Sequence, residues 1–197
     1  MGEINWNTAR ITVPYNMGKL NEKKMDILTE QLNKNGFAVN ARINSPDGAA
    51  VFILCQGKDN LILASNQFTY INSIEDNKFD WESLEKKIKL ILDTLLIDDD
   101  LKYVFNFEGD SEAENSHEES RKQYMENNKS ISEDIFGVGY RFLIKNESFE
   151  GEYKIEPMIN DKKKYYYQLI LNTLNNGMID HVIACVSREI EKRRDFK

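Results

Sequence analysis

The sequence contains the same succession of elements twice. Segments in which apolar and polar residues alternate lead into one amphipathic helix near residues 36–97, and again near 136–194. Alternation with a period of two is typical of strands that bury one face, and a helix is a common cover for that face. The sequence therefore predicts an α+β protein. We expect a mainly antiparallel sheet, or two sheets, with helices packed on one face and two similar halves, each a β-ladder followed by a helix.

An acidic stretch separates the two halves. We interpret residues 1–108 as a β-α-β4-α-β lobe, and residues 135–197 as a β3-α lobe that packs on the first sheet or continues it. Residues 109–134 carry 8 acidic and 3 basic side chains and few apolar ones. Because such a segment buries little surface, we expect a flexible loop or linker, with a regulatory or partner-docking role as an alternative. Ser111 and Glu114 have capping-box spacing, so a solvated helix there stays open.

Capping residues indicate where the helices begin and end. Asn21 is the expected N-cap of a first helix, and Asn35-Gly36 is its expected C-terminal stop. Asp80 is the expected start of a second helix. Near the C-terminus, apolar residues between Ile179 and Ile190 fall within a narrow arc at helical spacing, which favours a helix over a strand.

Strands are predicted near residues 9–15, 37–43, 49–55, 60–64, 67–72 and 101–107 of the first half. Pro14 places the first of these at a sheet edge or at a strand end. The run Ala50–Leu54 is apolar at every position. A strand without polar positions is typically buried on both faces, so we expect this one to lie centrally in the sheet.

Composition narrows the class of protein. The longest apolar run, Ala49–Cys55, is too short to cross a bilayer, and no secretory signal is visible. Two cysteines in 197 residues are typical of a reducing compartment, so we expect a cytoplasmic protein without a membrane partner. The chain has a net charge of −7 and lacks the concentrated positive face that nucleic-acid binding requires. Nucleic acid is therefore a disfavoured partner.

Two clusters are candidate binding residues. Lys162, Lys163 and Lys164 precede three tyrosines, a composition that can hold phosphates and stack bases. Alternation puts Tyr166 on the face opposite its two tyrosine neighbours, so we favour a structural use of the cluster. His181, Cys185 and Arg188 project away from the apolar stripe of the last helix. His181 and Cys185 are one turn apart and offer two zinc ligands where four are usual, so we favour a partly covered contact surface.

The sequence contains no recognisable catalytic or cofactor motif, so we predict no catalytic residues, no metal site and no cofactor. The favoured function is a non-catalytic protein-binding or assembly component, with a protein partner or a homo-oligomer. Two alternatives stay open. The first is a nucleic-acid-acting module, such as a metal-dependent nuclease, built from Lys154, Glu156, Asp161 and the three lysines. The second is a small-ligand module with a pocket lined by Tyr140, Phe142 and Tyr153.

Several segments carry a resemblance. Leu61–Tyr70 followed by Trp81-Glu82, and Gly137–Arg141 followed by Ile155–Pro157, resemble a sporadically distributed, uncharacterised bacterial family. This resemblance implies a two-lobed α+β shape and an origin in mobile or defence-associated gene neighbourhoods, and it supplies no catalytic residues. Lysine outnumbers arginine 19 to 7, which fits an AT-rich bacterial genome. The order of elements in the first half is similar to one half of a TATA-binding-protein-like fold, which does not transfer function.

Overall fold

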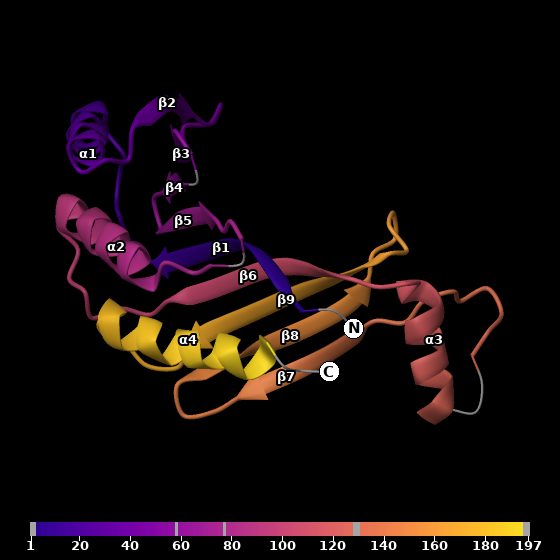
Figure 1. Cartoon of the computed structure of the whole chain (residues 1–197). Coiled ribbons are helices and arrows are strands. Elements are labelled where there is room, and N and C mark those ends of the chain that lie inside the picture. The colour runs from indigo at the N-terminus through magenta and orange to yellow at the C-terminus, as the bar shows by residue number, and fades with distance from the viewer. Residues whose placement is uncertain (1–2, 58, 77, 128–130, 195–197) are drawn as a thin grey trace.

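One continuous sheet forms the centre of the molecule. The computed structural model describes residues 3–57, 59–76, 78–127 and 131–194. Across these residues nine antiparallel strands lie in the order β2-β3-β4-β5-β1-β6-β9-β8-β7 (Figure 1). The strands are β1 (Asn5–Pro14), β2 (Val39–Asn44), β3 (Ala50–Cys55), β4 (Asp59–Ala64), β5 (Gln67–Ser73), β6 (Val104–Glu112), β7 (Tyr140–Lys145), β8 (Phe149–Pro157) and β9 (Lys164–Thr173). The expected α+β class with an antiparallel sheet is therefore confirmed.

Helices α1, α2 and α4 lie on one face of this sheet (Figure 1). The described helices are α1 (Glu22–Lys34), α2 (Trp81–Leu95), α3 (Ser116–Asn127) and α4 (Ile179–Arg194). Alternate residues of every inner strand point toward these helices and are buried, as in β9, where Tyr165, Tyr167 and Leu169 are at most 2% exposed. The hydrophobic core is therefore a single layer between the sheet and the helices.

The predicted helix caps are confirmed. The Asn21 side chain accepts a hydrogen bond from the Lys24 amide at 2.9 Å, and the Asp80 side chain accepts one from the Ser83 amide at 3.0 Å. The first helix ends at Asn35, and Gly36 follows it with a φ of +86°. A left-handed residue of this kind is what ends a helix sharply, and glycine adopts it without strain.

Residues 109–127 of the acidic stretch form a strand end and a helix, where the composition predicts a flexible loop or linker. β6 extends to Glu112, beyond the expected 101–107, and α3 begins at Ser116. α3 buries Ser116 and Ser120 rather than an apolar stripe. The Tyr165 hydroxyl donates to the Ser116 carbonyl oxygen at 3.0 Å, and the Val138 amide donates to the Ser120 hydroxyl at 3.1 Å. Polar contacts and close packing at small residues therefore attach this helix to the sheet.

The expectation that Ala50–Leu54 is a central strand is wrong. β3 is the second strand from one edge of the sheet, and β1 lies near the centre instead, with Pro14 at its last position. Val51 and Ile53 point to the core, but Phe52 and Leu54 are 36% and 39% exposed. β3 is thus apolar on a face that no described helix covers.

Candidate protein-binding surface

The sheet face opposite α1, α2 and α4 is open among the described residues (Figure 1). Several exposed side chains on its β2–β5 half are apolar. Cross-strand pairing places Ile43 beside Phe52, Phe52 beside Ile62, and Leu54 beside Ala41. Ile43 is 52% exposed and its neighbours are partly exposed. We call this surface the apolar patch; its members are Ala41, Ile43, Phe52, Leu54, Ile62 and Ile71.

On the other half of the open face, three charged side chains pair with one another. Lys154 of β8 lies 2.9 Å from the Glu152 carboxylate and donates to the Gln168 side-chain oxygen at 3.0 Å, and Arg141 of β7 also pairs with Glu152. The hydrogen bond from Lys154, and then that from Arg141, holds the pKa of Glu152 below its ordinary value. These charged side chains therefore have partners within the protein. The side chains of the apolar patch are instead exposed to water, which is typical of an interaction surface.

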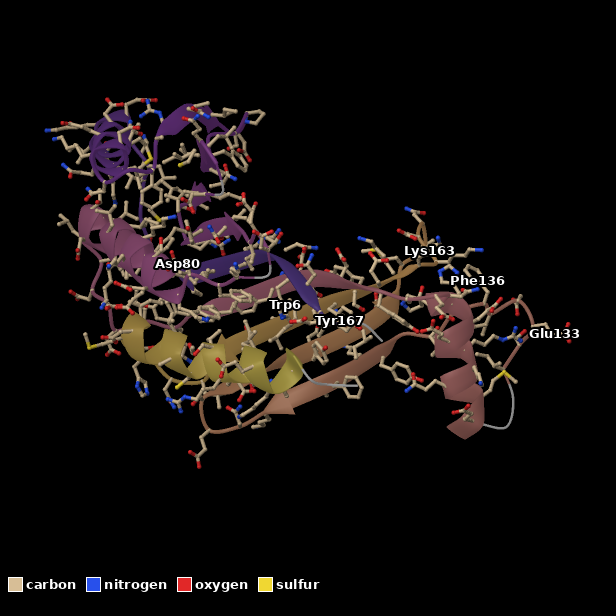
Figure 2. All side chains as sticks on the ribbon, viewed as in Figure 1. Trp6, Asp80, Glu133, Phe136, Lys163 and Tyr167 are labelled. Carbon is tan, nitrogen blue, oxygen red and sulfur yellow. The ribbon has the colours of Figure 1, made fainter. Side chains whose placement is uncertain are left out.

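The lysine cluster does not form a basic surface. Lys162 and Lys163 are exposed in the turn before β9, at the end of the sheet beside α3 (Figure 2). Lys164 lies 3.3 Å from Asp110, whose carboxylate raises the pKa of Lys164 through a hydrogen bond. Tyr166 is on the open face, opposite Asp110 on one side and Glu156 on the other. Lys164 and Tyr166 therefore have acidic neighbours, which oppose the attraction of phosphates, whereas Lys162 and Lys163 are exposed at the turn.

The second cluster lies on α4. His181 and Cys185 line a hollow of about 140 Å³ together with Phe149 of β8 and Thr173 of β9. Arg188 is exposed and is not among the residues that line it. The structure thus brings two of the three residues together. Among the described residues, no group of three histidine, cysteine, aspartate or glutamate side chains is placed to hold a metal ion.

The residues of the proposed nuclease do not converge. Lys154 is engaged with Glu152 and Gln168, as described above. Glu156 is the next residue of β8 on the same face as Lys154, and it is exposed. The Asp161 side chain accepts a hydrogen bond from the Lys163 amide at 3.0 Å within the turn. A two-metal site needs several carboxylates directed at one point, and this arrangement directs them apart.

The aromatic residues of the proposed ligand pocket form a stack on the helix side of the sheet. The rings of Tyr140 and Phe142 lie 6.3 Å apart, those of Phe142 and Tyr153 lie 6.2 Å apart, and those of Tyr153 and Tyr167 lie 6.3 Å apart. The Arg193 guanidinium lies 5.9 Å from the Tyr153 ring. An open hollow of about 390 Å³ adjoins Phe142 and Tyr153 at the edge of the sheet.

His117 has a fixed position that the sequence did not indicate. Its Nε2 donates to the Met158 carbonyl oxygen at 2.7 Å, and its ring packs edge-on against Phe136 with centroids 5.1 Å apart. A hollow of about 340 Å³ next to His117 is lined by Phe136, Glu156 and Ile159 among others, and its lining residues include no serine, threonine, cysteine or lysine.

Sequence reasoning missed the apolar patch. The signal was present, because Ala50–Leu54 has apolar residues at both strand parities. Such a pattern predicts a strand buried on both faces, and only the exposure of Phe52 and Leu54 in the structure shows that one face of β3 lacks cover.

No family model and no curated protein matches this chain. Within the described residues, none of the helices combines the length and apolar character that crossing a membrane requires.

The two cysteines should differ in reactivity. Burial, followed by the nearby Asp59 carboxylate, raises the pKa of the Cys55 thiol to about 11. At pH 8 about one Cys55 side chain in a thousand is then the reactive thiolate. Cys185 is only partly buried. With a thiol-specific chromogenic reagent, we expect one fast-reacting thiol in the native protein and the second only after unfolding. The Cys185→Ser variant should lose the fast phase, and a fast phase that survives would contradict the burial of Cys55.

Proposed function

We propose that the protein is a non-catalytic protein-binding component of a larger assembly, and that the apolar patch is its docking surface. The observation that carries this proposal is the exposure of Ile43, Phe52 and Leu54 side by side on an uncovered sheet face. Contiguous exposed apolar side chains with a polar border are a common property of protein–protein contacts. The charged half of the same face, with Lys154 and Glu152 paired, would supply such a border on one side.

A protein fits this surface better than nucleic acid does. Binding of a phosphate backbone requires unpaired cations, and here Lys164 pairs with Asp110, and Lys154 pairs with Glu152. The patch itself has no charged member. We therefore infer a partner with an apolar surface of its own. A cytoplasmic location and a part in a bacterial defence or mobile-element conflict system remain proposals, supported by the two-cysteine composition and the family resemblance.

Replacement of Ile43 by lysine tests this function. Ile43 is 52% exposed in the patch, and Ile27 is 47% exposed on α1, so Ile27→Lys is a matched control. Both changes remove a similar exposed apolar surface and should leave the unfolding free energy within about 1 kcal/mol of the native value. In affinity purification, we expect the tagged Ile43→Lys variant to retain at least tenfold less of a stoichiometric protein partner than the native protein does. The Ile27→Lys variant should retain the native amount.

Two results would contradict the proposal. One is equal retention of the partner by both variants. The other is co-purified nucleic acid that disappears in a Lys162→Ala/Lys163→Ala variant, since that result would identify the lysine turn as the functional surface.

A further inference from the structure

The outermost strand β7 presents an unusually apolar edge. β7 is the last strand of the sheet, and among the described residues it has a strand neighbour only on the β8 side (Figure 1). Leu143 is 83% exposed on the open face, and Phe142 is 39% exposed on the helix face. Proteins usually protect such edges with charges, prolines or bulges. β7 pairs with β8 without a register shift, and its Arg141–Lys145 segment has basic residues only at its two ends.

The β7–β8 turn shows which backbone groups point away from the sheet. The Asn146 amide donates to the Phe149 carbonyl oxygen at 2.9 Å, so these two residues form a hydrogen-bonded pair. Hydrogen-bonded pairs alternate along an antiparallel ladder. Phe142 therefore bonds to β8, whereas the amides and carbonyls of Arg141 and Leu143, and those of Lys145, point outward.

We propose that a second copy of this chain docks against β7, so that two β7 strands pair in antiparallel fashion about a two-fold axis and join the two sheets. The axis would pass at Phe142, which faces its own copy. Leu143 would then pair with Arg141 of the other copy through the outward backbone groups, and Tyr140 would face Ile144.

Charge selects this register. A two-fold pairing keeps each residue on its own side of the sheet, and an axis at Phe142 or at Leu143 pairs five of the six β7 residues. An axis at Arg141 or Ile144 would pair only three of them. With the axis at Leu143, Arg141 of one copy would face Lys145 of the other, and like charges directly opposite each other are destabilising. With the axis at Phe142, no like charges face each other, and an aromatic pair forms at the centre.

The opposite edge of the sheet lacks these properties. In β2 the register shifts between Val39 and Ala41, which marks a bulge or irregularity. Its Arg42 side chain is held by Asp26 of α1 at 2.7 Å, and the strand ends in Asn44. An edge with a register shift and a paired arginine at its middle discourages strand addition. In the proposed dimer the apolar patches of the two copies stay uncovered near the outer ends of the joined sheet, so the dimer would bind its partner bivalently.

The mass of the protein in solution tests the dimer. We expect light scattering during gel filtration to give twice the 23.0 kDa of one chain, with a dissociation constant on the order of 10 µM, because a strand-edge contact is small. Leu143→Pro removes an outward amide and leaves the bonds of Phe142 to β8, so it should abolish the dimer. Leu143→Thr keeps the amide and suits a strand, so it should retain it.

A cross-linking pair tests the register in a Cys185→Ser background. Opposite residues of a non-hydrogen-bonded pair have Cα atoms about 4.5 Å apart, within disulfide range, whereas diagonal residues lie about 7–8 Å apart. Phe142→Cys should therefore form a disulfide-linked dimer on mild oxidation, and Leu143→Cys should not. The reverse result would shift the axis to Leu143 and overturn the proposed register.

A wild-type chain that stays monomeric at millimolar concentration would overturn the dimer, and so would a dimer that persists in Leu143→Pro. A monomer that instead acquires a strand from another protein at β7 would also overturn it, since the proposed occupant is a second copy. The patch variant Ile43→Lys should remain dimeric, so failure of this inference and failure of the proposed function are distinguishable.

Discussion

Replacement of Phe107 by alanine is expected to lower the unfolding free energy by about 3–5 kcal/mol. Phe107 of β6 is fully buried under α2. Its ring lies 5.6 Å from the ring of Phe79, 6.2 Å from those of Trp81 and Phe105, and 6.3 Å from that of Trp6. Removal of the central ring leaves a cavity that these large neighbours cannot fill without leaving their rotamers.

Phe52→Ala is the matched control, because it deletes the same atoms from an exposed position of the apolar patch. Phe52 is 36% exposed, so we expect a loss of about 1 kcal/mol or less. Urea denaturation of both variants followed by circular dichroism measures the difference. Equal losses would show that Phe52 belongs to the folding core, and would remove the basis for assigning it to a partner.

The second large effect is expected at a buried ion pair between the sheet and α2. Asp59 of β4 is 8% exposed, and the Lys87 ammonium lies 2.6 Å from its carboxylate. The Tyr70 hydroxyl also donates to this carboxylate. The Asn72 side chain is a further donor, at 3.0 Å. Burial, and then the bond to Asp59, raises the pKa of Tyr70, so this donor keeps its proton at physiological pH.

Lys87→Met should therefore destabilise the fold by about 2–3 kcal/mol, because it leaves a carboxylate in the core without its cation. Lys86→Met is the control on the same helix. Lys86 pairs with Glu82 at 2.5 Å, but both side chains are more than two-thirds exposed, and water screens such pairs so that they add little to stability. Adding Asp59→Asn to Lys87→Met should recover part of the loss. Similar melting temperatures for the two single variants would mean that the Asp59 carboxylate is hydrated in solution.

Local signals in the sequence predicted most of the elements. Helix caps depend on one side chain and the backbone within four residues of it, which is why Asn21 and Asp80 were identified without a structure. The alternation of Tyr165, Tyr166 and Tyr167 assigned the two faces of β9 for the same reason. These features follow from near neighbours in the chain.

Strand order and cover depend on contacts between distant residues, which periodicity does not encode. β3 has the composition of a central strand, yet it lies next to an edge, and Phe52 is exposed as a result. α3 lacks an apolar stripe, so its attachment through Ser116 and Ser120 left no hydrophobic pattern to detect. The sequence shows that β3 is apolar on both faces, but which of the two faces the helices leave uncovered depends on the tertiary packing and could not be predicted from it.

The most direct test of the proposed function is site-specific photocross-linking in the producing cell, with a photoreactive amino acid in place of Phe52 or, as a control, Ile27. Both positions are exposed, and only Phe52 lies on the apolar patch. We expect one discrete protein adduct from position 52 and none of that mass from position 27. The same adducts from both positions, or adducts to nucleic acid from position 52, would contradict the assignment of the apolar patch as a protein-docking surface.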